Sequence, residues 1–320
     1  MSVADKLKDI KKLKEKRVEK KVYRDLDKIP TGRASDHITE GCLVLEGGAW
    51  KGLYTVGVLD ALMVHDINFR TTVGISAGGL AGLGYVAGQI GVSANIDLKY
   101  RHDPKYCGIK AYKENHGITG FTYLYHDLFK SSHVDIKRVK ETPRRLVVGA
   151  TNMNTGKIEY FEKGSCNLSA AIRASATVPY VSRPVVIKGV PYLDGGCATR
   201  IPYAWAKEES GEDKIIVVKT REREFKRSGK IPRLTRYLYK DYPLLIESLE
   251  RANDDFNALN EEMYAEEAKG NIFIMAPSKK VEVTRFEGDM DKLGDLYWLG
   301  YHDMEERLPA LLEYLKAGKE

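Results

Sequence analysis

Short apolar runs alternate with amphipathic stretches along most of this chain. The runs are rich in β-branched residues and are bounded by Gly, Pro or charged residues, which predicts buried strands at 42–46, 69–73, 146–151, 157–161, 185–187, 190–193, 214–219 and 271–275. Apolar residues that recur every three or four positions predict helices at 53–63, 77–90, 168–176, 245–263 and 303–316. Strands that alternate with helices on this scale predict an α/β fold with a largely parallel central sheet.

Two parts of the pattern depart from this alternation. The runs at 146–151 and 157–161 flank Asn154-Thr155-Gly156 and are expected to form a hairpin, and those at 185–187 and 190–193 flank Lys188-Gly189. Residues 98–138 are aromatic and polar without a clear period, and we expect an irregular excursion there.

The longest uncharged stretch lies between Arg70 and Asp97. A run of this length is a warning sign of a membrane span. Residues 71–96, however, contain seven glycines, several hydroxyl side chains, an Asn and a Gln. This composition transfers poorly into lipid and favours a helix packed tightly inside a globular core.

Charge divides the chain into two parts. Of the net charge of +6, residues 1–30 supply +5, with eleven Lys or Arg against six Asp or Glu. We expect a basic N-terminal arm (1–38) before one domain (39–320). Residues 6–21 suit a solvated helical arm, an oligomer contact or a contact with anionic lipid headgroups. The lack of interleaved aromatic residues argues against nucleic acid.

The N-terminus and the cysteines bear on location. The first 21 residues have no apolar segment of the kind found in secretion signals. The four cysteines form no C-x-x-C pair and no zinc spacing, which favours reduced thiols and a cytoplasmic protein.

A serine between glycines follows the second predicted strand. Gly74-Ile75-Ser76-Ala77-Gly78 matches G-x-S-x-G between a strand and a helix, where a sharp turn exposes a nucleophilic hydroxyl. Residues two positions away on each side must lack bulk, and the start of the helix offers free N–H groups. The alternative is a serine that only caps the helix.

A second glycine-rich loop, GGAWKG at 47–52, also joins a strand to a helix. Its amides are suited to stabilising an oxyanion beside the serine. The loop lacks the Gly-Lys-Ser/Thr of a P-loop, and a formal dinucleotide fingerprint at 82–87 lies within a helix rather than after a strand.

The serine needs a base, and Asp194 is the best-placed carboxylate. It follows the strand at 190–193 and precedes Gly195-Gly196, although Asp-Gly is also a common turn pair. The order Ser76, Asp194, His302 leaves a conventional triad open as an alternative.

Together, GGAWKG, GISAG, Ala174–Pro179 (ASATVP) and Asp194-Gly195-Gly196 resemble the bacterial patatin-like phospholipases, over about half of the chain. The resemblance implies a three-layer α/β/α sandwich and hydrolysis of lipid acyl esters by a Ser-Asp dyad, without a metal or cofactor. It implies Ser76 as nucleophile and Asp194 as base, and a packing role for 174–179. The oxyanion donors would come from Gly47, Gly48 and Ala49. The supporting motif positions are Lys51, Gly52, Gly74, Gly78, Gly195 and Gly196.

One residue departs from the family pattern. The family usually has Gly where Ala49 stands, and a Cβ restricts positive φ. A non-catalytic lipid-binding or scaffold protein of the same fold is therefore the alternative function.

The expected substrate is a phospholipid or another acyl-ester lipid, and its pocket is expected to involve 98–138. Residues 219–233, with seven Lys or Arg, two Glu, Phe225 and Ile231, are a second candidate for peripheral membrane contact. The sequence does not fix acyl-chain preference or oligomeric state.

Overall fold

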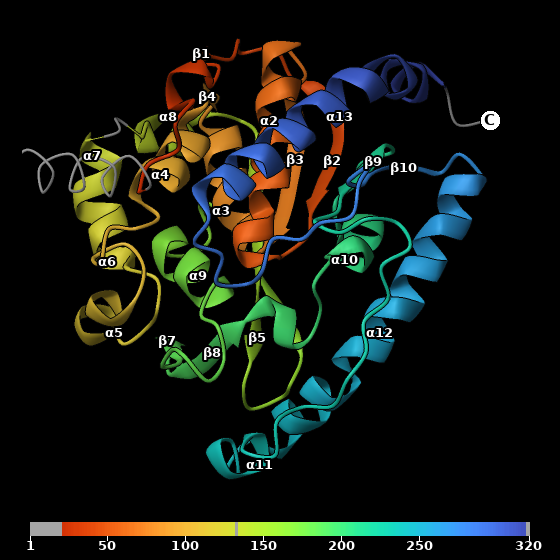
Figure 1. The fold of residues 1–320 in the computed structure, drawn as a ribbon. Helices are drawn as coiled ribbons and strands as arrows, with labels where there is room; N and C mark the ends of the chain where they lie inside the picture. The colour runs from red at the N-terminus through yellow and green to blue at the C-terminus, as the bar shows by residue number, and fades with distance from the viewer. Residues whose placement is uncertain (1–20, 132–133, 318–320) are drawn as a thin grey trace, which may run out of the picture.

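A computed structural model of the chain describes residues 21–131 and 134–317 (Figure 1). The main sheet has the order β10-β9-β2-β3-β5-β8-β7, with β6 also paired to β5. The five strands from β10 to β5 are parallel to their neighbours, whereas β6, β7 and β8 pair antiparallel. The strands are β2 (Thr39–Leu45), β3 (Phe69–Ile75), β5 (Arg145–Asn152), β6 (Ile158–Glu162), β7 (Val185–Ile187), β8 (Val190–Asp194), β9 (Ile215–Val218) and β10 (Ile272–Met275). The predicted α/β fold and the hairpin of 146–151 with 157–161 are confirmed. The sheet is mixed, with a parallel run of five strands, and β7 and β8 form a second hairpin.

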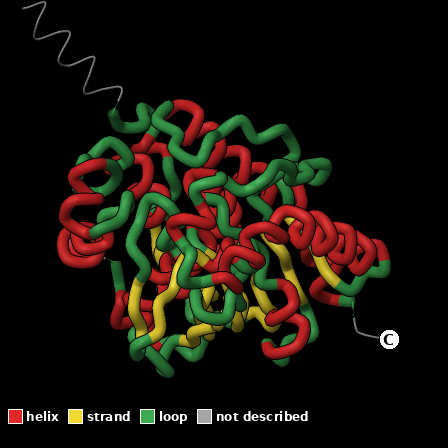
Figure 2. The backbone as a smooth tube through the Cα atoms, turned by 90° about the horizontal axis from the view of Figure 1, so that it is seen from below, coloured by secondary structure: helices red, strands yellow, loops and turns green. Residues whose placement is uncertain are grey.

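Helices cover both faces of this sheet, as the alternation of its side chains requires. Leu43 and Leu45 of β2 belong to one core, and Cys42 and Val44 belong to the other. Strands accordingly lie inside a shell of helices and loops (Figure 2). Helices on the first side are α2 (Gly52–Val64), α3 (Ala77–Val86), α4 (Val92–Tyr100), α9 (Leu168–Ser175) and α13 (Met290–Lys316). Helices on the second side are α10 (Tyr203–Glu209) and α12 (Pro243–Ala268).

The last helix, α13, begins well before the predicted position 303. It crosses α2 so closely that a Cβ on Gly57 would lie 2.0 Å from Tyr297 O, and one on Gly300 would lie 2.0 Å from Tyr54 O. Glycines therefore let the two backbones touch instead of interrupting the helix. Asp289 caps the true start by accepting the N–H groups of Asp291 and Lys292.

Short helices make up much of the described part of 98–138, with turns and loops between them, so the expectation of an irregular excursion is only partly right. Phe121, Tyr125 and Phe129 stand four residues apart, and neighbouring rings of this series contact one another with centroids 5.9 and 5.2 Å apart. The four-residue spacing is that of a helix, but it covers only these three rings and runs through separate short segments. No long helical period is therefore visible in the sequence. The segments are α5 (Ile109–Asn115), α6 (Phe121–Tyr123), the π-helical η3 (Leu124–Leu128), α7 (Phe129–Ser131) and α8 (Ile136–Glu141).

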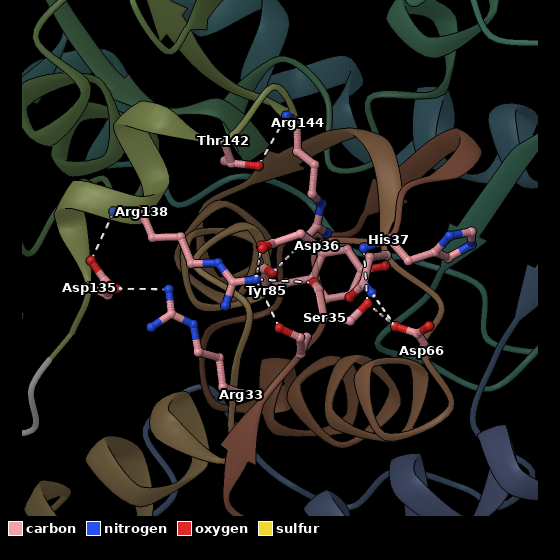
Figure 3. Close-up of polar contacts among 12 residues, drawn as sticks. Arg33, Ser35, Asp36, His37, Asp66, Tyr85, Asp135, Arg138, Thr142 and Arg144 are labelled. Atoms are coloured by element: carbon pink, nitrogen blue, oxygen red, sulfur yellow. Dashed lines mark hydrogen bonds and ion pairs between the residues drawn. The ribbon is translucent and has the colours of Figure 1, made fainter.

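Residues 21–38 are part of the folded body, so the arm expected at 1–38 ends too late. Tyr23 is buried against Gly294 of α13. The guanidinium of Arg138 donates to the carbonyls of Ala34 and Ser35 and to the Asp36 carboxylate (Figure 3). Residues 1–20, which include nearly all of the basic stretch 6–21, lie outside the described residues. The elements of this region are η1 (Leu26–Lys28) and β1 (Gly32–Arg33), which pairs with β4 (Gln89–Ile90).

The uncharged stretch forms β3 and the buried helix α3, as predicted. Among the described residues, no helix is both long enough and apolar enough to cross a bilayer. Three short helices complete the fold: η2 (Ala49–Lys51), η4 (Gly195–Cys197) and α11 (Thr235–Leu238).

Candidate active site

Ser76 occupies a strained turn between β3 and α3. Its φ of 54° and ψ of −119° lie outside the regions that side-chain-bearing residues favour, at a cost of about 1–3 kcal/mol. The turn is so tight that a Cβ on Gly74 would lie 2.6 Å from the carbonyl carbon of Gly78. A Cβ on Gly78 would lie 2.5 Å from Leu45 O. The expected need for small residues on both sides of the serine is confirmed.

The Ser76 hydroxyl points at Asp194, the last residue of β8. Ser76 Oγ donates to Asp194 Oδ2 over 2.7 Å, and the N–H of Gly196 donates to Asp194 Oδ1 over 2.7 Å. Only 7% of Ser76 and 9% of Asp194 are exposed. The two residues predicted to act together therefore form a shielded, directly bonded pair.

Burial sets the electrostatics of this pair. Loss of hydration raises the pKa of the Asp194 carboxyl, while the hydrogen bonds from Ser76 and Gly196 and the nearby charges of Arg200 and Arg285 oppose the rise. A raised pKa makes the carboxylate a stronger proton acceptor than an ordinary aspartate.

Among the described residues, His302 makes its contacts elsewhere and forms no hydrogen bond with Ser76 or Asp194. It is exposed on α13, where its ring stacks on Trp298 with centroids 5.5 Å apart and meets Tyr301 edge-on. The two oxygens of Asp194 are bonded to Ser76 and Gly196 instead. The described residues thus assemble Ser76 with Asp194 and leave His302 on another surface.

The glycine-rich loop lies against the serine turn. A Cβ on Gly47 would lie 3.0 Å from Ile75 O and 3.3 Å from Ser76 Cβ, so only a glycine fits this approach comfortably. The N–H of Gly47 donates to Arg200 O, however, and is therefore not free for an oxyanion. The expectation that Gly47 is a donor is corrected for this reason.

The N–H groups of Gly48 and Ala49 stand at the start of η2 and have no hydrogen-bond acceptor among the described residues. Ala49 adopts a φ of 50° despite its Cβ, so the departure from glycine is accommodated at the cost of backbone strain. These two amides are the remaining loop candidates for an oxyanion hole.

Lys51 and Gly52 support the loop. Lys51 Nζ lies 3.5 Å from Gly48 O, and burial, followed by the charges of Arg221, Arg227 and Arg285, lowers the Lys51 pKa to about 8. A Cβ on Gly52 would lie 2.8 Å from Ala77 Cβ, which explains the small residue there.

The segment 174–179 does more than pack. Ser175 Oγ accepts the N–H of Ser76 over 2.8 Å, and the carbonyl of Thr177 accepts the N–H of Asp194 over 2.8 Å. One segment thereby holds the backbones of both Ser76 and Asp194. The packing role expected for 174–179 is therefore incomplete, and the serine within the family motif is the only signal of the hydrogen bond in the sequence.

Gly195 and Gly196 hold Asp194 in place from the other side. A Cβ on Gly195 would lie 2.4 Å from Gly149 O of β5, so the chain turns directly over the sheet after Asp194. Gly196 supplies its amide to the carboxylate.

An apolar cavity of about 140 Å³ opens beside the Ser76 hydroxyl. Its walls come from α3, α4 and the helical stretch after residue 105, which agrees with the expected contribution of 98–138. Arg285 and Phe286, from the segment before α13, also line it. Apolar residues of the wall include Leu80, Leu83, Ile96, Ile118, Leu124, Phe129 and Val178.

Comparison with known proteins agrees with this geometry. The family profile described as "Patatin-like phospholipase" matches residues 43–206, and "Domain of unknown function (DUF6363)" matches residues 242–316. The uncharacterized protein YjjU of Escherichia coli (strain K12) is 25% identical over 183 residues, covering 56% of this chain and 51% of YjjU. The "Probable lipid hydrolase 463L" of Invertebrate iridescent virus 6 is 26% identical over 204 residues, covering 56% of this chain and 69% of 463L.

This chain thus spans between about half and two thirds of the length of these relatives. Among solved structures, VipD from Legionella pneumophila aligns over 88% of this chain and 70% of VipD, with 14% identity and a TM-score of 0.47. The family profile covers more than half of the chain and includes the serine turn, the glycine-rich loop and Asp194. This chain is a member of the patatin-like phospholipase family.

Proposed function

We propose that this chain hydrolyses acyl esters of lipids, with Ser76 as nucleophile and Asp194 as base. The observation that carries the proposal is the 2.7 Å bond between Ser76 Oγ and Asp194 Oδ2 beside an apolar cavity. The hydroxyl is held in a strained turn, and its bond to the carboxylate prepares the proton transfer that activates it.

In the first half of the reaction, Ser76 Oγ adds to the ester carbonyl carbon and its proton passes to Asp194. The N–H groups of Gly48 and Ala49 stabilise the oxyanion that forms on the carbonyl oxygen. When the carbonyl re-forms, the ester C–O bond breaks and the departing alcohol takes the proton from Asp194. The acyl group is now an ester of Ser76.

In the second half, water attacks this acyl ester and gives a proton to Asp194. Collapse of the intermediate breaks the bond to Ser76 Oγ, which recovers that proton, and a fatty acid is released. Because Asp194 alternates between base and acid, its raised pKa suits both half-reactions.

The walls of the site indicate the class of substrate. Leucine, isoleucine and phenylalanine side chains line the cavity and suit an acyl chain. Arg285 at the same cavity and Arg200, whose charges both act on Asp194, make the surroundings electropositive and suit a phosphate-bearing headgroup. A phospholipid combines both features.

The test is fatty-acid release from a short-chain phosphatidyl ester by purified variants. Ser76→Ala and Asp194→Asn should each lower kcat by roughly 10⁴-fold or more. His302→Ala is the matched control and should stay within a few-fold of the parent chain. An equally large loss in His302→Ala would establish a triad, whereas lipid binding without fatty-acid release by the parent chain would leave a non-catalytic lipid-binding protein.

A further inference from the structure

The short helix α11 and the residues around it expose an unusual amount of apolar surface. Leu234 is 56% exposed, Tyr237 76%, Leu238 46% and Leu244 46%. The helix lies beside the start of α12, at the bottom of Figure 1, where Tyr239 packs with Leu193 of β8 and with Met153. These side chains are therefore exposed along one short segment at this end of the molecule, which we name the α11 tip (residues 230–244).

Positive charge surrounds the same segment. Residues 226–240 contain six Lys or Arg and no Asp or Glu. Arg236 pairs with Glu250, and Lys226 pairs with Glu261. The exposed side chains of Lys230, Arg233 and Lys240 form no ion pair with another described residue.

The α11 tip is joined to the substrate cavity. Val178 lines the cavity, and Tyr180 follows two residues later. The N–H of Tyr180 donates to Tyr239 Oη over 3.0 Å, and its hydroxyl lies 2.8 Å from Thr235 Oγ1. The segment that leaves the active site is thus fastened directly to α11.

Part of the segment 219–233, which the sequence suggests as a membrane contact, is not available on the surface. Phe225 packs on Phe256 of α12 with centroids 6.5 Å apart, so it is not free to enter a lipid layer. Lys219 is fully buried, and Arg223 is held by Glu267. Within 219–233, Lys230 and Arg233 are exposed, form no ion pair with another described residue and belong to the α11 tip.

We propose that the α11 tip docks this chain on anionic lipid surfaces, with Tyr237, Leu238 and Leu234 entering the interface and Lys230, Arg233 and Lys240 contacting the headgroups. Exposed apolar side chains ringed by unpaired cations complement such a surface in both polarity and charge. The proposal rests on the proposed function, because docking beside the cavity delivers an aggregated substrate to Ser76. The α11 tip itself takes part in no step of the proposed hydrolysis.

Two full-length double variants test the α11 tip: Tyr237→Ser/Leu238→Ser and Arg233→Glu/Lys240→Glu. The matched control is Leu312→Ser/Lys316→Glu at the end of α13, on the opposite side in Figure 1. Binding is measured by sedimentation with vesicles of phosphatidylglycerol and phosphatidylcholine, and with phosphatidylcholine alone. Hydrolysis of a soluble short-chain ester and thermal unfolding are measured in parallel.

We expect the charge variant to bind anionic vesicles about 25-fold more weakly or worse at low salt, since each cation near the surface contributes roughly a fivefold factor. The apolar variant should lose about tenfold. The control should bind like the parent chain, and all three should keep hydrolysis of the soluble ester.

Two outcomes would overturn the proposal: unchanged vesicle binding in both α11 variants, or an equal loss of vesicle binding in the control. Ser76→Ala separates the two proposals, because it should bind vesicles normally while releasing no fatty acid. If Ser76→Ala remains active, the proposed chemistry fails while the docking result stands on its own.

Discussion

Adding one methyl group at Gly78 tests whether the turn geometry governs activity. In Gly78→Ala, the new Cβ would lie 2.5 Å from Leu45 O, whereas ordinary contact begins at 3.4 Å. The start of α3 must therefore move away from β2 by about 0.9 Å, and Ser76 immediately precedes this helix. A displacement of about 1 Å at reacting groups costs on the order of 100-fold in rate.

The neighbouring glycine provides the control. In Gly79→Ala, the nearest atom to the new Cβ is the side-chain atom Val148 Cγ1 at 3.1 Å, and it can adjust by a few tenths of an ångström. Both alanines gain up to about 1 kcal/mol of helix propensity, but only Gly78→Ala also incurs roughly 1–3 kcal/mol of overpacking.

We expect Gly78→Ala to lower kcat for a soluble ester about 100-fold while remaining folded, and Gly79→Ala to stay within about threefold. Steady-state kinetics and chemical denaturation measure the two effects separately. Equal activities for the two variants would refute the reasoning, because the contacts at the turn would then have no influence on the hydroxyl.

Three further predictions follow from the site. Ala49→Gly should raise the free energy of unfolding by about 0.5–1 kcal/mol, because relief of roughly 1–2 kcal/mol of left-handed strain exceeds the entropy cost of glycine. A chemical denaturation curve shifted to lower denaturant concentration would contradict this expectation. Asp194 must be ionised to act as base, and burial raises its pKa. The acidic decline of kcat/KM should therefore begin at a pH above the ordinary aspartate range, and a decline centred at or below pH 4 would contradict this expectation. Arg285→Gln should lower kcat/KM about tenfold for a phosphatidyl ester but within threefold for an uncharged one, and equal losses would contradict a headgroup contact.

Much of the fold could be predicted because its strands are short, apolar and clearly bounded. The side chains of β2 and β9 alternate between two cores, so both strands read as continuous apolar runs. Predictions failed where the signal depends on tertiary contacts. Gly300 of α13 resembles a break until α2 is placed against it, and Gly294 does so until Tyr23 is packed there. The aromatic series of 121–129 spans several short helical segments.

The site could be predicted in its residues but not in its hydrogen bonds. Ser76 and Asp194 lie at motif positions that a strand end fixes, and the structure brings them together. That the Gly47 amide is bonded to Arg200 O depends on a backbone contact across 153 positions, which no local pattern encodes. The same reason hides the bond between Ser175 and the Ser76 amide.

The most direct test of the central claim is covalent labelling of Ser76 by an alkyl fluorophosphonate, which transfers its phosphonyl group to an activated serine oxygen as fluoride leaves. Intact-mass and peptide analysis should find one adduct per chain on the peptide that contains Ser76. The adduct should be absent from Ser76→Ala, and Asp194→Asn should form it far more slowly because the hydroxyl has lost its base. Equal labelling of the parent chain and Ser76→Ala would contradict the account.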